Sequence, residues 1–471
     1  MKTNSTAAAV LAAFLLAVAP TYAQHEHHQS QTPPAEPQDE HAGHDMQGME
    51  GMDHTGHDME GMDHDMAGHS MHSMFGSYPM TREASGTAWQ PESAPHGGLH
   101  RMAGDWELMT HGFVQVIYDD QDGPRGGTKS FSENMWMGMA NRPLGAGRFG
   151  LRAMLSAEPW TIGRGGYPLL LQTGETANGV DPLVDRQHPH DVFMELAASW
   201  SVPVGAPEDG SSLFVYLGLP GEPALGPPAF MHRFSGMENP EAPLSHHWLD
   251  STHITFGVAT LGWVRGPFKL EGSVFTGREP DESRLNIESP KMDSWSTRFS
   301  FNPTKDWSFQ ASYGRLHSPE QLEPEIDTER TTLSAIYNRP LANGNWQTTL
   351  AWGRNVKDPG TDPSTTTDAW LLESAATCRR HTLFARAEKQ ENDELFGHGG
   401  EELAGDDDHG HAGEVFNVGK FSLGYIYDLI ATGTYKLGVG GLGSVAFIPS
   451  EIQDVYGDRP VSWMGFLRVR I

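Results

Sequence analysis

Apolar and polar residues alternate along most of the chain from about residue 106 to its end, in stretches of about ten residues that turn-forming residues separate. Between residues 192 and 202, for example, one face consists of Val192, Met194, Leu196, Ala198, Trp200 and Val202. Successive side chains of a strand point to opposite faces, so this period sets one face against lipid and the other against a lumen. The pattern predicts an all-β fold, an antiparallel transmembrane β-barrel over residues 105–471.

The connections between these stretches alternate between short and long. Seven short connections, such as 265–267 and 378–380, alternate with eight mostly longer ones, such as 158–189 and 220–251. Outer-membrane barrels have short turns at their periplasmic end and longer loops at the other end. Fifteen connections join about 16 strands, within a range of 14–18, and tryptophans near the strand ends fit the aromatic girdles of such barrels.

The first 104 residues lack this alternation. Residues 1–23 have the pattern of a secretory signal peptide, with Lys2, an apolar run from Ala7 to Ala19, and Ala23 before the expected cleavage point. Residues 24–74 are rich in His, Met and Asp and contain almost nothing that could form a core, so we expect a disordered arm. Residues 75–104 contain several Pro and Gly and are predicted to be a linker.

The arm carries side chains that bind soft metal ions. Thioethers recur three residues apart, and imidazoles lie between them. Thioether sulfur suits Cu(I), whereas imidazole suits Cu(II), Ni and Zn, so copper in both oxidation states is the first expectation, with silver, nickel and zinc as alternatives. The candidate ligands are His44, Met46, Met49, Met52, His54, His57, Met59, Met62, His64, Met66, His69, Met71, His72 and Met74. The alternative is a solvated acidic tether in which Met has no particular role.

Composition narrows the choice of function. The 471 residues carry a net charge of −29, which argues against nucleic acid as a partner. Only 37% of the residues are hydrophobic, and no run approaches the roughly 20 apolar residues of a membrane-spanning helix. The single cysteine, Cys378, excludes an internal disulfide framework and a Cys-based zinc site.

Two of the predicted long loops carry histidines at the spacing of metal ligands. One loop contains the run from Asp185 to Asp191, and the other contains the run from Ser245 to His253. If both loops fold inward, they form either a second metal site in the lumen or a hydrogen-bonded plug, and the sequence does not decide between the two. The residues concerned are His188, His190, Asp191, His246, His247, Asp250 and His253.

We expect no enzyme activity and no catalytic residues. Ser245 or Ser251 can be paired with His253 on paper, but the surrounding sequence offers no identifiable oxyanion element.

A signal peptide, a repeat containing Gly-His-Asp-Met and Met-Asp-His, and a β-rich region together resemble the copper-resistance outer-membrane protein B family. The resemblance is specific for residues 43–74, whereas the barrel region looks like uncharacterised bacterial outer-membrane proteins. The resemblance implies copper tolerance at the outer membrane by sequestration or assisted efflux. The implied partners are membrane lipid, metal ions and periplasmic copper carriers or efflux components, with the arm in the periplasm.

Two other functions stay open at this point. One is a passive, porin-like channel for small solutes in which the arm only buffers metal. The other is a soluble periplasmic metal chaperone with a β-sandwich body, because sandwich strands also alternate.

Overall fold

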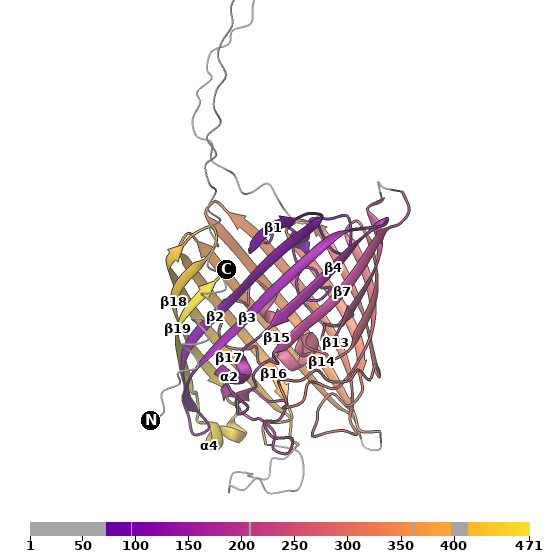
Figure 1. The fold of residues 1–471 in the computed structure, drawn as a ribbon. Helices are drawn as coiled ribbons and strands as arrows, with labels where there is room; N and C mark the ends of the chain where they lie inside the picture. The colour runs from indigo at the N-terminus through magenta and orange to yellow at the C-terminus, as the bar shows by residue number, and fades with distance from the viewer. Residues whose placement is uncertain (1–71, 96, 207–208, 361–362, 397–412) are drawn as a thin grey trace, which may run out of the picture.

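One antiparallel sheet closes on itself to form a barrel in the computed structural model, which describes residues 72–95, 97–206, 209–360, 363–396 and 413–471 (Figure 1). The sheet has 17 strands, of which 16 form the wall and one, β1, pairs only beside the start of β2. Pairing of β19 with β2 closes the wall. The prediction of about 16 strands is confirmed, and the β-sandwich alternative is wrong because one continuous sheet encloses the lumen.

The strands follow one another around the wall in chain order. They are β1 (Leu99–Ala103), β2 (Trp106–Gln121), β3 (Gly127–Leu144), β4 (Gly147–Leu155), β7 (Phe193–Pro203), β8 (Ser211–Gly218), β9 (Val258–Arg265), β10 (Phe268–Phe275), β11 (Ser294–Thr304), β12 (Trp307–Leu316), β13 (Asp327–Leu341), β14 (Gly344–Asp358), β15 (Thr365–Cys378), β16 (His381–Asn392), β17 (Phe416–Ala431), β18 (Lys436–Phe447) and β19 (Val461–Arg470). The short and long connections alternate as predicted, which gives the barrel a short-turn end and a long-loop end.

The remaining elements are short and lie in the connections or before the barrel. They are η2 (Met80–Arg82), α2 (Glu158–Thr161), β5 (Tyr167–Pro168), β6 (Arg186–Gln187), η4 (Phe230–His232), α3 (His246–Leu249), η5 (Ser251–His253), η6 (Ser450–Ile452) and α4 (Gln453–Tyr456). Among the described residues, no helix is both long and apolar enough to cross a membrane.

The outside of the wall is apolar and its inside is polar. Along β10, Phe268, Leu270 and Val274 are exposed, whereas Lys269 and Glu271 between them are buried. This arrangement is the reverse of a soluble protein and is the arrangement that lipid requires. Exposed tryptophans and leucines recur around the whole wall. The chain is therefore an outer-membrane β-barrel.

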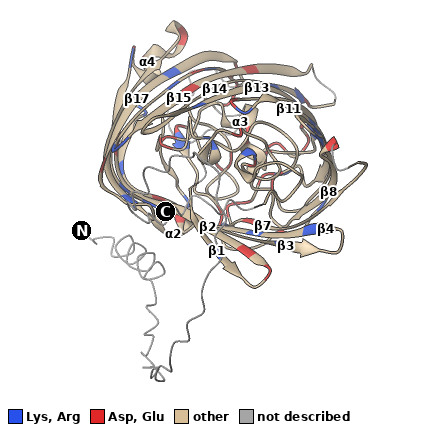
Figure 2. Cartoon of the chain, turned by 90° about the horizontal axis from the view of Figure 1, so that it is seen from above, with Lys and Arg blue, Asp and Glu red and all other residues tan. Residues whose placement is uncertain are grey.

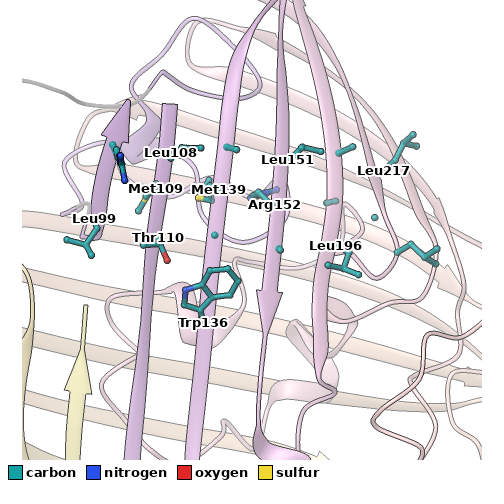
Figure 3. Close-up of a pocket in the computed structure, with 18 residues that line it drawn as sticks. Leu99, Leu108, Met109, Thr110, Trp136, Met139, Leu151, Arg152, Leu196 and Leu217 are labelled. Carbon is teal, nitrogen blue, oxygen red and sulfur yellow. The ribbon is translucent and has the colours of Figure 1, made fainter. Parts of the chain in front are cut away.

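One part of the lipid-facing surface is hollowed. A depression of about 910 Å³ lies over β1 to β4, β7 and β8. Figure 3 shows Leu108, Trp136, Leu151 and Leu217 around it. Small residues, including Gly138, form its floor, so the surface sinks where large side chains are missing.

Segments from both ends of the barrel occupy the lumen, as the view down the barrel shows (Figure 2). The first, residues 72–95, is the lumenal segment, and it lies at the short-turn end. Arg298 Nη2 donates to Thr87 Oγ1 at 2.9 Å, and Asn302 Nδ2 donates to the carbonyl of Gln90 at 2.8 Å. Most of the predicted linker, 75–104, thus lies inside the barrel, and its end forms β1. Buried wall side chains that bond its backbone hold it there.

The second segment, residues 219–257, is the plug loop, and it enters from the long-loop end. Arg233 fastens it to the wall: its Nε lies 2.7 Å from Glu373 Oε1 on β15, and its Nη1 lies 2.7 Å from Asp250 Oδ2 within the loop. The backbone N–H of Ala229 donates to Ser85 Oγ at 2.7 Å, so the plug loop and the lumenal segment contact each other. The two segments, which enter from opposite ends of the barrel, therefore meet inside it.

Candidate functional site

The structure places all seven histidine and aspartate residues of the two predicted loops in one buried region. Residues 156–192 and the plug loop both leave the wall at the long-loop end, and both fold into the lumen. The candidate residues that lie together there include His188, Asp191, His246 and His247. Their contacts are described below. The loops carry their histidines into the same space because they are neighbours around the rim, a relation that the chain order does not reveal.

Three of the imidazoles are held through their Nδ1 atoms. His190 Nδ1 lies 2.8 Å from Glu158 Oε2, and His246 Nδ1 lies 2.8 Å from Asp250 Oδ1. His253 Nδ1 donates to the carbonyl of Asp250 at 2.8 Å. Each Nδ1 faces an oxygen acceptor and so carries a proton, which places the lone pair of the neutral ring on Nε2. Histidines that bind metal are fixed in this manner.

These three rings lie close to one another. The ring centroids of His246 and His253 are 5.0 Å apart, and those of His190 and His253 are 5.4 Å apart. The ring of Phe230 packs against all three. His253 Nε2 is buried and has no hydrogen-bond partner in the structure. An imidazole nitrogen buried without a partner is costly, which makes it a candidate ligand atom.

A second group lies beside the first. The candidate ligand atoms of His247, Glu279 and Glu320 all lie within 4.8 Å of one another, the one such group of three among the residues that the structure describes. Imidazole and carboxylate donors suit divalent ions such as zinc or nickel better than Cu(I). Glu279 and Glu320 come from loops that carry no histidine motif, so sequence reasoning missed them. It also missed Glu158, and no local signal marked any of the three.

The charges of this second group are mutually balanced. Burial alone would lower the pKa of His247, but the adjacent Glu279 and Glu320 carboxylates outweigh it and raise that pKa to about 9. Burial alone would raise the pKa of Glu279, yet the His247 imidazolium lowers it. Burial and the Glu279 charge raise the pKa of Glu320. Without a metal, the His247 imidazolium and the Glu279 carboxylate therefore neutralise each other across 3.5 Å, although His247 Nε2 and both Glu279 oxygens have no hydrogen-bond partner among the described residues.

We expect the barrel to lose stability as the pH rises from 6 to 9. Because the folded pKa of His247 lies above that of a free imidazole, its stabilisation is complete below about pH 6.5 and disappears as the pH rises through about 9. The contribution is on the order of 3 kcal/mol. The raised pKa of Glu320 acts in the same direction. Thermal unfolding in detergent should show a shallower pH dependence for His247→Gln than for the unmodified chain, and equal slopes would contradict the assignment.

Other side chains close the site. His188 Nε2 lies 3.2 Å from Glu175 Oε1, and Arg284 pairs with both Glu175 and Asp191. A cavity of about 10 Å³ lies among His188, His190, His246 and His253. This volume is at the lower limit for a single water molecule, so the site is compact. The site contains hydrogen-bonded loop side chains as well as imidazole and carboxylate groups that could bind a metal, so the choice between a ligand site and a plug stays open.

The two serines that could be paired with His253 have other partners. Ser245 Oγ donates to Glu388 Oε1 at 2.7 Å, and Ser251 Oγ accepts from Arg330 Nη1 at 2.9 Å.

Twelve of the fourteen predicted ligands in the arm lie outside the described residues. The two exceptions belong to the lumenal segment. His72 Nδ1 lies 2.6 Å from Glu107 Oε1 on β2, and Met74 is buried with its N–H donated to Glu83. The predicted metal-binding repeat therefore leads directly into the lumen.

No protein-family model and no curated protein matches the chain. Its structure is similar to that of OprB of Pseudomonas putida, with 9% identity and a TM-score of 0.48 over 78% of this chain and 94% of that one. It is also similar to Salmonella typhi OmpF in complex with daunomycin, with 10% identity and a TM-score of 0.46 over 79% and 100%. It is similar as well to the anion-selective porin from Comamonas acidovorans, with 12% identity and a TM-score of 0.42 over 78% of this chain and 100% of that one. The fold assignment itself rests on the strand pairings and lipid-facing side chains described above.

Proposed function

We propose that this outer-membrane barrel serves copper and silver homeostasis or resistance. In this proposal residues 24–74 capture the ion in the periplasm through Met and His, and the barrel holds or passes it. One observation carries the proposal: the chain continues from the His/Met repeat into the lumenal segment, where His72 contacts Glu107 of the wall and Met74 is buried. Outer-membrane barrels have their short turns in the periplasm, and the lumenal segment lies at that end.

The filled lumen favours a barrel that holds or gates its cargo over a passive channel. Residues 219–257 are almost entirely buried, and the lumenal segment covers the short-turn end from inside. A passive porin needs a continuous aqueous bore. The buried imidazole and carboxylate groups of the plug loop supply further ligands along the lumen, in keeping with a route for ions.

The role of the arm is tested by removing its thioethers from the complete protein. Replacing Met46, Met49, Met52, Met59 and Met62 by leucine should lower the number of Cu(I) ions bound by about two, one for each group of Met-x-x-Met spacing. Anaerobic titration against a competing chelator measures this number. Met464→Leu, a buried methionine far from the arm in sequence, is the control and should change nothing. An unchanged stoichiometry in the fivefold variant would remove the basis of the proposal.

A further inference from the structure

Methionine is concentrated in one of the two large buried clusters. The cluster that includes the lumenal segment has 21 members, of which nine are Met. The other cluster has 24 members, of which one is Met, although its task of filling space is the same. Leucine and methionine have nearly the same volume and exchange at little cost in a core. Packing alone therefore does not explain why the methionines are concentrated in the cluster that includes the lumenal segment.

The sulfur-rich side of the wall is built by strand register. On β2 and β3, Met109 lies opposite Met139, and His111 lies opposite Met137. Figure 3 shows Met109 and Met139 beside each other on these two strands. All four positions face the lumen, because Trp136 and the other alternate residues of β3 face outward. Elsewhere on the wall most lumen-facing positions are polar or charged.

Imidazole nitrogens and sulfurs are in direct contact here. His111 Nε2 lies 3.2 Å from Met137 Sδ, and His232 Nε2 lies 3.4 Å from Met154 Sδ. The centroids of the two imidazole rings are 5.9 Å apart. A sulfur at about 2.3 Å and a nitrogen at about 2.0 Å from one tetrahedral ion lie about 3.5 Å from each other. Each contact has the separation of two ligands on one ion, and the contact between His111 and Met137 is the one whose two residues both line the cavity described next.

A cavity of about 70 Å³ is lined by His111, Met137 and His232, whereas Met154 lies outside its lining. The wall contributes Met109, His111, Met137 and Met139, the lumenal segment contributes Met80, and the plug loop contributes His232 and Met237. The volume exceeds the roughly 10–15 Å³ that one water molecule requires, so an ion fits. Glu83 and Arg470 also line the cavity, and Arg470 is paired with Glu238 at 2.8 Å. The donors are thus mostly neutral and soft.

We propose that this cavity binds one monovalent soft ion, Cu(I) or Ag(I), between the imidazoles of His111 and His232 and the thioethers of Met137 and Met139. The inference deepens the proposed function and rests on it for the supply of the ion. Thioether and neutral imidazole donors favour a soft monovalent ion over zinc or nickel. In this proposal the cavity is the site inside the barrel that binds the ion after the arm has captured it.

The test uses the complete protein loaded with Ag(I) and then dialysed against excess free methionine. Free methionine removes silver from flexible thioether sites, whereas a preorganised site keeps its ion. We expect the unmodified chain to retain about one silver ion and the double variant Met137→Leu, Met139→Leu to retain at least tenfold less. Met464→Leu, equally buried in the other cluster, should retain as much as the unmodified chain. Equal retention by the double variant and the control would overturn the proposal.

X-ray absorption of the retained silver provides a measurement that needs no variant. Sulfur together with nitrogen neighbours is the expected result, and oxygen neighbours alone would overturn the site. The fivefold arm variant separates the two proposals. If it keeps the retained ion and also keeps its full Cu(I) stoichiometry, the arm proposal fails while the cavity stands. If the stoichiometry falls but the double cavity variant still retains silver, the cavity proposal fails alone.

Discussion

Replacing Arg233 with methionine should unseat the plug loop and make the barrel conduct. This guanidinium is fully buried and bonds Glu373 on the wall, Asp250 in the loop and the carbonyl of Pro228. These two carboxylates hold its pKa above the ordinary value against the opposing effect of burial. Methionine fills a similar volume but leaves two carboxylates buried without that partner. Arg386, 3.2 Å from Glu373, compensates only one of them.

The expected effect is large because an uncompensated buried charge is expensive. Removing one partner of a buried ion pair costs about 3–5 kcal/mol, which is about two to three and a half powers of ten in an equilibrium constant. The population of the undocked state of the plug loop, relative to the docked state, should rise by that factor. Once the loop leaves, only the lumenal segment and residues 156–192 still occupy the lumen of a barrel whose 16 strands leave room for an aqueous channel. Single-channel recordings in planar bilayers should therefore show much greater conductance for Arg233→Met than for the unmodified protein.

An exposed arginine supplies the matched control. Arg315 pairs with Asp327 at 3.0 Å near the long-loop end, but about half of its side chain is exposed. Exposed ion pairs contribute about 0–1 kcal/mol, so Arg315→Met should conduct like the unmodified chain. The double variant Arg233→Met, Asp250→Asn removes the carboxylate that has lost its cation and should recover part of the closed state. Equal conductance for Arg233→Met and Arg315→Met would show that the pair does not hold the plug.

The strands of the wall could be predicted from sequence because each depends on local information. Alternation sets the two faces, and residues such as Gly266 and Pro267 mark the turns. The same rule gives no answer for Met135-Trp136-Met137-Gly138-Met139, because Trp136 between the methionines is apolar as well. The methionines face the lumen, where the plug loop and lumenal segment make this part of the interior apolar.

The candidate site could be predicted only in part, for a related reason. The histidines stand in recognisable runs, and the structure brings His190, His246 and His253 together. Their carboxylate partners come singly from other loops. Glu279 is bracketed by Arg278 and Pro280, and nothing in that context indicates a neighbouring His247. The inward fold of each loop is decided by tertiary contacts, such as that between Arg233 and Glu373, which have no sequence periodicity.

Introducing valine at Gly353 should expel α3 from the wall and disperse the histidine group that it carries. Gly353 faces the lumen on β14, and a Cβ there would lie 2.2 Å from the carbonyl oxygen of Trp248 and 2.8 Å from its carbonyl carbon. Backbone atoms cannot swing aside as the end of a flexible side chain can. The bond from Asn355 Nδ2 to the carbonyl of His247, 3.0 Å long, would break with the same displacement.

The expected cost combines both effects. Overpacking a filled site costs about 1–3 kcal/mol, and a lost hydrogen bond adds about 0.5–1.5 kcal/mol. Thermal unfolding should therefore occur at lower temperature, and the fall in stability between pH 6 and 9 should become shallower because His247 no longer adjoins Glu279. Gly443→Val is the control, since a Cβ on this lipid-facing glycine of β18 meets nothing within 4 Å. If both variants melt alike and keep the same pH dependence, α3 does not depend on direct contact with the wall. Loss of the pH dependence in Gly353→Val alone would tie the charge state of His247 to the docking of α3 against a glycine.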